Sequence, residues 1–179
     1  MNRLTKKKKI MILIDLIILA VLVVLDQFTK LLAVNNLKDA SAVAIIRNVL
    51  ELQYLENNGA AFGMLQNQKA FFVLIAVLIL IVICYVIFLL PDDKKYNYLD
   101  FLLVMVASGA IGNMIDRFRT GYVVDFIYFK LINFPIFNVA DIYVTVSTIL
   151  LIILFLFYYK EDDFAFLSFK QQRKYRQPK

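Results

Sequence analysis

Histidine is absent from this 179-residue chain, and cysteine occurs once, at Cys84. Without histidine, neither a Ser-His-Asp triad nor a Cys-His pair can form. A zinc site of the usual histidine and cysteine type is not expected either, because Cys84 lies inside an apolar run without a polar neighbour. A single cysteine cannot form an intrachain disulfide, so the redox compartment stays undetermined.

Charge is also scarce, since 61% of the residues are hydrophobic and the mean hydropathy is +0.72. A soluble domain is closer to half apolar. The apolar excess is arranged in blocks, which indicates membrane spans. The formal charge of +6 raises the question of nucleic-acid binding. The basic residues gather at the chain ends and not on one face of a domain, so we expect no nucleic-acid partner.

Four apolar blocks cover residues 10–34, 70–90, 98–115 and 139–159. Each approaches the ~20 residues that a helix needs to cross a bilayer. The lysines before the first block resemble a signal-peptide start, but the block is long and lacks a small-residue cleavage site, so we interpret it as a retained span. We predict an all-α polytopic membrane protein with four transmembrane helices. Residues 1–160 form one domain, and 161–179 form a basic cytoplasmic tail.

The distribution of Lys and Arg predicts the orientation. With the N-terminus inside, segments 1–9, 91–97 and 160–179 face the cytoplasm, and they hold 13 of the 20 basic residues. The positive-inside rule therefore places both termini in the cytoplasm. Residues 35–69 and 116–138 then lie outside.

A small β element is expected in the first outer loop. Leu50, Leu52 and Tyr54 alternate with polar residues there, which is typical of a half-buried strand. The glycines of "NNGAAFG" would permit residues 52–66 to close over a substrate. The second outer loop is rich in aromatics, which favour the headgroup zone.

The costly polar residues all fall at one level, the outer leaflet boundary. An ionised side chain at membrane depth costs at least ~2.5–3.5 kcal/mol, so their shared depth predicts a common site. The ends of three spans and the first outer loop supply them: Asp26, Lys30, Asn57, Asn113, Asp116, Asn138 and Asp141.

Some of these acids have nearby basic partners. Asp26 and Lys30 are four residues apart with the acid first, the favourable order for an ion pair on a helix. Asp116 is followed by Arg117 and Arg119. Gly109 lies on the same helix face as Asp116, where it permits close approach of a neighbouring helix or a substrate.

Asp125 and Asp141 have no basic residue within four positions, and both are flanked by apolar residues. If they meet, desolvation and mutual repulsion raise the pKa of one of them. Two such carboxyl groups share a proton, and their titration belongs to the pair. One could activate water as a general base, while the other polarises a scissile carbonyl and then protonates the leaving amine.

Structural interpretations stay open beside this one. The Asp26–Lys30 pair could be purely structural, Asp125 a solvated loop acid, and Asp141 a first-turn acid favoured by the helix dipole. The remaining polar residues could cap helices: Asn113, Asp116, Arg117 and Asn138. Two other functions also stay open, a small proton-coupled transporter and a non-enzymatic lipid-binding or assembly protein. The transporter is disfavoured because residues 70–90 carry no ionisable side chain except Cys84 and Tyr85.

Five short motifs, in order, resemble those of lipoprotein signal peptidase (signal peptidase II), the bacterial membrane aspartic endopeptidase. They are "DQFTK" at 26–30, "NNGAAFG" at 57–63, "GAIGNMIDR" at 109–117, "GYVVDFI" at 121–127 and "FPIFNVAD" at 134–141. The resemblance covers residues 10–155. One departure is that Ile142 and Tyr143 follow "NVAD", where the family often has a small residue.

The resemblance implies that Asp125 and Asp141 are the catalytic pair. It also implies that Asn57, Asn113, Arg117 and Asn138 bind substrate, while structural support comes from Asp26, Lys30, Gly109 and Asp116. The implied reaction removes signal peptides from diacylglyceryl-modified prolipoproteins, cutting just before the lipidated cysteine. It needs no metal or other cofactor. The expected partners are these prolipoproteins and membrane lipids, and we expect a monomer.

Overall fold

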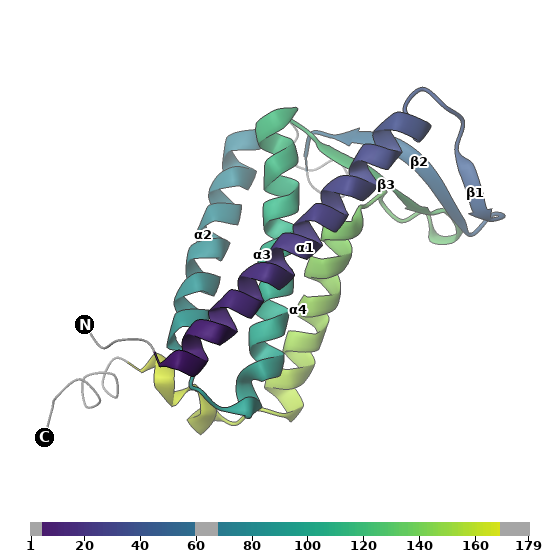
Figure 1. Cartoon of the computed structure of the whole chain (residues 1–179). Helices are drawn as coiled ribbons and strands as arrows, with labels where there is room; N and C mark the ends of the chain where they lie inside the picture. Colours follow the sequence, from purple (N-terminus) through teal and green to yellow (C-terminus); the bar gives the residue numbers. More distant parts are fainter. Residues whose placement is uncertain (1–4, 60–67, 169–179) are drawn as a thin grey trace, which may run out of the picture.

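Four helices long and apolar enough to cross a bilayer make up the body of the computed structural model, which describes residues 5–59 and 68–168 (Figure 1). They are α1 (Lys6–Leu37), α2 (Lys69–Leu89), α3 (Asn97–Arg119) and α4 (Val139–Phe157). The predicted fold class is confirmed, although α3 continues four residues past the predicted range. Asp116, Arg117 and Arg119 therefore belong to the last turns of a helix and not to a loop.

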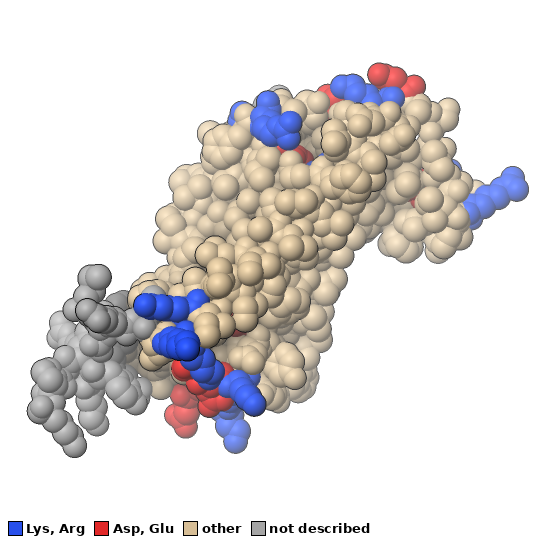
Figure 2. Space-filling model, viewed as in Figure 1, with Lys and Arg blue, Asp and Glu red and all other residues tan. Residues whose placement is uncertain are grey.

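The central helix is α3, which packs against α1, α2 and α4. Small residues at Ser108, Gly109 and Gly112 are buried in it and allow its neighbours to come close. The outer faces of α1, α2 and α4 expose many Leu, Ile, Val and Phe side chains. Figure 2 shows charged residues gathered at the two ends of the molecule, with an uncharged band between them. Such a band suits contact with lipid hydrocarbon.

Helix ends opposite the sheet are joined by polar and aromatic contacts. Lys8 donates hydrogen bonds to the carbonyls of Ile87 (2.6 Å) and Leu90 (3.1 Å), so the start of α1 satisfies the end of α2. Two short helices, η2 (Lys94–Tyr96) and η4 (Glu161–Leu167), also lie at this end, and a Lys95–Asp163 ion pair of 2.6 Å joins them. The separate tail at 161–179 stays a prediction, because its basic residues 170–179 lie outside the described part of the chain.

The sheet has three antiparallel strands in the order β1–β2–β3: β1 (Val43–Ile46), β2 (Leu50–Asn57) and β3 (Val123–Phe129). The predicted strand is confirmed as β2, and Leu52 and Tyr54 pack against the buried Val124 and Phe126. Glu51, one of the polar residues of the same alternating pattern, is also buried and pairs with Lys130 at 2.7 Å.

The chain after β3 turns back onto that strand before α4 begins. After the short helix η3 (Lys130–Ile132), Phe137 forms a bridge to Ile127, with its N–H donating to the Ile127 carbonyl at 3.0 Å. Asn138 follows directly and is the N-cap of α4. This return brings the start of α4 beside the middle of β3. The second outer loop, in which we expected Asp125 but no strand, thus contributes β3 to the site.

Candidate active site

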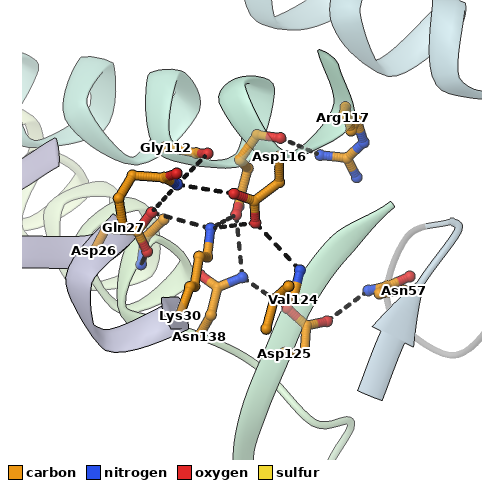
Figure 3. A network of polar contacts seen from close by, with 12 residues as sticks. Asp26, Gln27, Lys30, Asn57, Gly112, Asp116, Arg117, Val124, Asp125 and Asn138 are labelled. Atoms are coloured by element: carbon orange, nitrogen blue, oxygen red, sulfur yellow. Dashed lines mark hydrogen bonds and ion pairs between the residues drawn. The ribbon is translucent and has the colours of Figure 1, made fainter. Parts of the chain in front are cut away.

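A buried lysine organises the outer end of the helix bundle (Figure 3). The Nζ atom of Lys30 lies 3.0 Å from Asp26 Oδ2 and 2.9 Å from Asp116 Oδ2, and it donates to Asn113 Oδ1 at 2.9 Å. The ammonium group therefore uses its three donors on three oxygens of α1 and α3. The predicted Asp26–Lys30 pair is present. The partner of Asp116 is Lys30, and the expected pairing with Arg117 or Arg119 is wrong.

The two acids of this cluster also hold the chain around them. Asp26 Oδ1 accepts from the backbone N–H of Ala140 at 2.9 Å, which ties α1 to the first turn of α4. Asp116 Oδ2 accepts from the N–H of Val124 at 3.2 Å, which ties α3 to β3. Four elements therefore meet at one ionic cluster. Its position fixes β3 and the start of α4 relative to each other.

Asp125 lies on β3, next to Val124, and it is 1% exposed. Its carboxylate accepts hydrogen bonds from the side-chain amides of Asn57 (2.7 Å) and Asn138 (2.6 Å). Burial raises the pKa of Asp125 to about 7; the nearby Asp141 adds to the rise, while the amides of Asn57 and Asn138 oppose it. A carboxyl group that titrates near neutrality can hold a proton and also release it.

Asp141 lies in the first turn of α4 and shares its partners with Asp125. Asn138 and Asp141 form a capping box, in which each side chain accepts from the other residue's backbone N–H, at 3.0 and 3.1 Å. Asn113 donates to Asp141 Oδ1 at 2.8 Å, and Asn138 donates to Asn113 Oδ1 at 3.1 Å. The two acids are thus joined through two amides, and the capping and first-turn roles considered above are also present.

Arg117 supplies a cation on the other side of the pair. Its Nη2 donates to the carbonyl of Gly59 at 3.1 Å, and its Nη1 to the carbonyl of Asn113 at 3.4 Å. Its charge lies within electrostatic range of Asp125 and Asp141. Figure 3 shows Arg117 and Asn57 approaching the site from different elements, the end of α3 and the end of β2.

A cavity of about 490 Å³ opens beside the two acids. Asp125, Asp141, Asn113, Arg117 and Asn57 form its polar lining. Its other walls are largely apolar: Phe72, Val123, Phe134, Pro135, Ile136, Phe137, Ile142 and Val146. Such a cavity suits an extended peptide with apolar substituents, because a few polar groups face one point while hydrophobic walls exclude water.

Other predicted site residues lie behind this surface. Asn138 is 0% exposed and does not line the cavity, so its amide holds the two acids from behind. Asp26, Lys30, Gly109 and Asp116 are likewise outside the lining. The closing segment expected at 52–66 falls partly on residues 60–67, which lie outside the described residues. Among residues 5–59 and 68–168, no three His, Cys, Asp or Glu side chains are grouped to hold a metal ion.

Some lining residues were not expected from the sequence. Phe72 is an apolar residue in apolar surroundings, so nothing distinguishes it from a lipid-facing side chain. Residues 134–137 open the motif "FPIFNVAD", but no role in lining a cavity was expected for them. Gln27 donates to Asp116 Oδ1 at 2.8 Å and to the Gly112 carbonyl at 3.2 Å. Its place inside "DQFTK" could have indicated this role.

Gly109 sets the distance between α3 and α4, and its replacement should be costly. A Cβ atom at this position would lie 2.5 Å from the carbonyl oxygen of Ala140 and 2.7 Å from Val144 Cγ2. We predict that Gly109→Ala lowers the free energy of unfolding by ~1–3 kcal/mol, as overpacking does. Helix propensity alone predicts the opposite change in stability, because it favours Ala over Gly by ~1 kcal/mol. Thermal unfolding of the purified protein tests it, and a more stable variant would contradict the close approach.

The chain is similar to known proteins over most of its length. The family model "Signal peptidase (SPase) II" matches residues 18–157. The lipoprotein signal peptidase of Caldanaerobacter subterraneus subsp. tengcongensis is 49% identical over 143 residues, 79% of this chain and 95% of that protein. The lipoprotein signal peptidase of Clostridioides difficile is 41% identical over 143 residues, 80% of this chain and 95% of that protein.

A solved structure of a bacterial membrane enzyme superimposes with a TM-score of 0.71 and 31% sequence identity, covering 92% of each chain. A second bacterial membrane enzyme gives a TM-score of 0.69 and 35% identity, covering 81% of this chain and 94% of that one. The arrangement of four membrane helices and a small sheet is therefore shared with solved proteins. The chain belongs to the lipoprotein signal peptidase (signal peptidase II) family of bacterial membrane aspartic peptidases.

Proposed function

We propose that this peptidase cuts diacylglyceryl-modified prolipoproteins just before the lipidated cysteine, with Asp125 and Asp141 as its catalytic pair. The observation that supports the pair is the convergence of two acids, far apart in sequence, on one largely apolar cavity through the shared amides of Asn113 and Asn138. The two carboxyl groups share one proton in the resting enzyme.

Hydrolysis then proceeds without a covalent intermediate. Asp125 holds the proton, because it is buried and its pKa is raised to about 7. Asp141, whose oxygens accept from the amide of Asn113 and the backbone N–H of Asn138, is the general base. It removes a proton from water as the water oxygen attacks the scissile carbonyl carbon, and Asp125 donates its proton to the carbonyl oxygen. Collapse of the tetrahedral species breaks the C–N bond. One of its hydroxyl groups returns a proton to Asp125 as the C=O bond re-forms, and the amine leaves with the proton that Asp141 took from water.

Asn57 and Arg117 face the cavity, and we assign them to binding the peptide backbone of the substrate. A guanidinium has five N–H donors, and the hydrogen bonds among the described residues use two of those on Arg117. Asn57 donates one side-chain N–H to Asp125 and has a second N–H for a peptide. Asn113 also lines the cavity, but its amide donates to Asp141 and its carbonyl accepts from both Lys30 and Asn138. Asn113 and Asn138 therefore orient the acids, which is a more specific role than general substrate binding.

The site works at the outer leaflet boundary, with both termini in the cytoplasm. The start of α1 and the end of α4 lie at the end of the bundle opposite the sheet (Figure 1), and the excess of Lys and Arg at that end favours the cytoplasmic side. A lipid chain on the substrate cysteine would remain in the outer leaflet while the scissile bond reaches the acids. One chain supplies every residue of the proposed site, so a monomer suffices.

Cleavage of a lipid-modified precursor by the purified full chain tests this function. A diacylglyceryl-modified precursor peptide and its unmodified counterpart are incubated with the protein in detergent and in lipid vesicles. We expect cleavage of the modified peptide alone, with the new N-terminus at the lipidated cysteine. Equal cleavage of both peptides would remove the lipid requirement, and cleavage of neither would overturn the proposal.

The pH dependence of the reaction follows from the raised pKa of Asp125. The proton that Asp125 holds below about pH 7 is the proton needed for catalysis, so kcat/KM should fall about tenfold per pH unit once the pH passes well above that value. The control variant Glu56→Gln removes another acid of the same outer region, and its kcat/KM should fall with pH as that of the wild type does. A kcat/KM that stays flat through neutral and mildly alkaline pH would show that no such proton is involved.

A further inference from the structure

An aromatic ring covers the guanidinium of the active-site arginine. The Cζ atom of Arg117 lies 4.6 Å from the ring centroid of Phe72, within the range of a cation–π contact. Phe72 belongs to the first turn of α2, a helix whose composition alone suggests only lipid-facing or core side chains. Among the described residues of α2, Phe72 is the one that lines the cavity.

The other contacts that Arg117 makes with residues 5–59 and 68–168 hold the guanidinium weakly. Of its two hydrogen bonds to these residues, the one to the carbonyl of Asn113 is long at 3.4 Å, and the other reaches Gly59, which follows β2. Both bonds act at the edge of the group. The guanidinium lies over the ring of Phe72, and this contact adds to the two hydrogen bonds in limiting how the cation can rotate.

The neighbouring aromatic residue does not share this position. Phe71 packs edge-on against Phe72, with ring centroids 5.7 Å apart, but its side chain is 45% exposed and it does not line the cavity. The two residues have the same side chain and lie in the same turn of α2. They differ in whether they contact Arg117, so Phe71 offers a matched control.

We propose that Phe72 is a positioning residue that holds the guanidinium of Arg117 over the cavity, so that its free N–H donors meet the peptide backbone of the substrate. This inference rests on the proposed function. The ring also shields the cation from water at this depth, which strengthens both the cation–π contact and the hydrogen bonds that Arg117 makes to a bound peptide. Phe72 thereby acts on substrate binding through Arg117 and takes no part in proton transfer.

Steady-state cleavage of the diacylglyceryl-modified precursor by Phe72→Leu, Phe72→Tyr and Phe71→Leu tests the proposal. Loss of an interaction made equally to substrate and transition state raises KM and leaves kcat unchanged. We expect Phe72→Leu to raise KM by roughly tenfold with kcat within about twofold of wild type. Phe72→Tyr, which keeps an aromatic face, should restore KM, and Phe71→Leu should match wild type. Thermal unfolding of each purified variant accounts for any loss of folded protein.

A double-mutant cycle separates positioning from simple packing. All variants of the cycle also carry Asp141→Asn, so that they bind the precursor without cutting it. The Kd of the precursor is measured for four proteins: with no further change, with Phe72→Leu, with Arg117→Gln, and with both Phe72→Leu and Arg117→Gln. We expect Phe72→Leu to weaken binding by roughly tenfold with Arg117 and less than about twofold without it. The proposal would be overturned if Phe72→Leu raised the Kd by the same factor with Arg117 and with Arg117→Gln. It would also be overturned if Phe72→Leu and Phe71→Leu had the same KM while the wild-type enzyme cuts normally. If the wild-type chain cuts no precursor, the proposed function fails and this inference falls with it.

Discussion

Asp125→Asn and Asp141→Asn should each slow cleavage of the lipid-modified precursor by a factor of about 10³ or more, while the protein still inserts and folds. Each substitution keeps the shape of the side chain but removes a group that exchanges a proton. In Asp125→Asn the new NH2 group would face one of the two donor amides, Asn57 or Asn138, which lie 2.7 and 2.6 Å from the carboxylate oxygens in the wild type. Single-turnover rates are therefore compared on equal amounts of folded protein.

The matched control for these variants is Asp39→Asn, which removes an exposed acid from the same outer region. This variant should cut at the wild-type rate. If either Asp125→Asn or Asp141→Asn retained activity within about tenfold of wild type, that acid would not be part of the proton exchange. A non-enzymatic role for the cavity would then become the better interpretation.

Lys30→Met should destabilise the protein more than any other single change considered. It removes the cation that lies 3.0 Å from Asp26 and 2.9 Å from Asp116, and it leaves two carboxylates buried without a counter-charge. Removing one partner of a buried ion pair costs ~3–5 kcal/mol. The loss is measured as the change in free energy of unfolding, from chemical denaturation of the protein purified in detergent.

Two further variants show whether the cost comes from the unpaired acids. Lys38→Met removes a lysine of the same region that pairs with Glu56 at 3.1 Å but is largely exposed, and it should change stability little. Adding Asp116→Asn to Lys30→Met should recover part of the loss, because one stranded carboxylate becomes neutral. Equal stability of Lys30→Met and Lys38→Met would show that the cluster does not hold the elements together.

The helical part of the fold could be predicted from the sequence because each span is an apolar run of the length that a bilayer requires. The strand β2 could be predicted from the alternation at Leu50, Leu52 and Tyr54. Strand β3 could not, because "VVDFIYF" is buried at its first four positions and shows no alternation. Its pairing with β2 joins residues 66 to 79 positions apart, from Asn57–Val123 to Leu50–Phe129, and local pattern does not reveal such a contact.

The candidate site could likewise be predicted from the sequence only in part. Asp125 and Asp141 were identified because they lack local counter-charges, which is a property of the sequence itself. The partner of Asp116 was assigned wrongly, since Lys30 reaches it across a helix–helix contact while Arg117, one residue away, turns toward Gly59. Phe72 was missed because an apolar residue in an apolar helix carries no mark of the cation that it covers.

The central claim is that Asp125 and Asp141 act as one unit on a shared proton. The most direct test is the single-turnover cleavage rate of the Asp125→Asn/Asp141→Asn double variant, compared with the rates of the two single variants. For groups that act as a unit, the losses do not multiply. We predict that the double variant cuts the lipid-modified precursor no more slowly than the slower single variant. A double variant slowed by the product of the two single factors would show that the acids act independently.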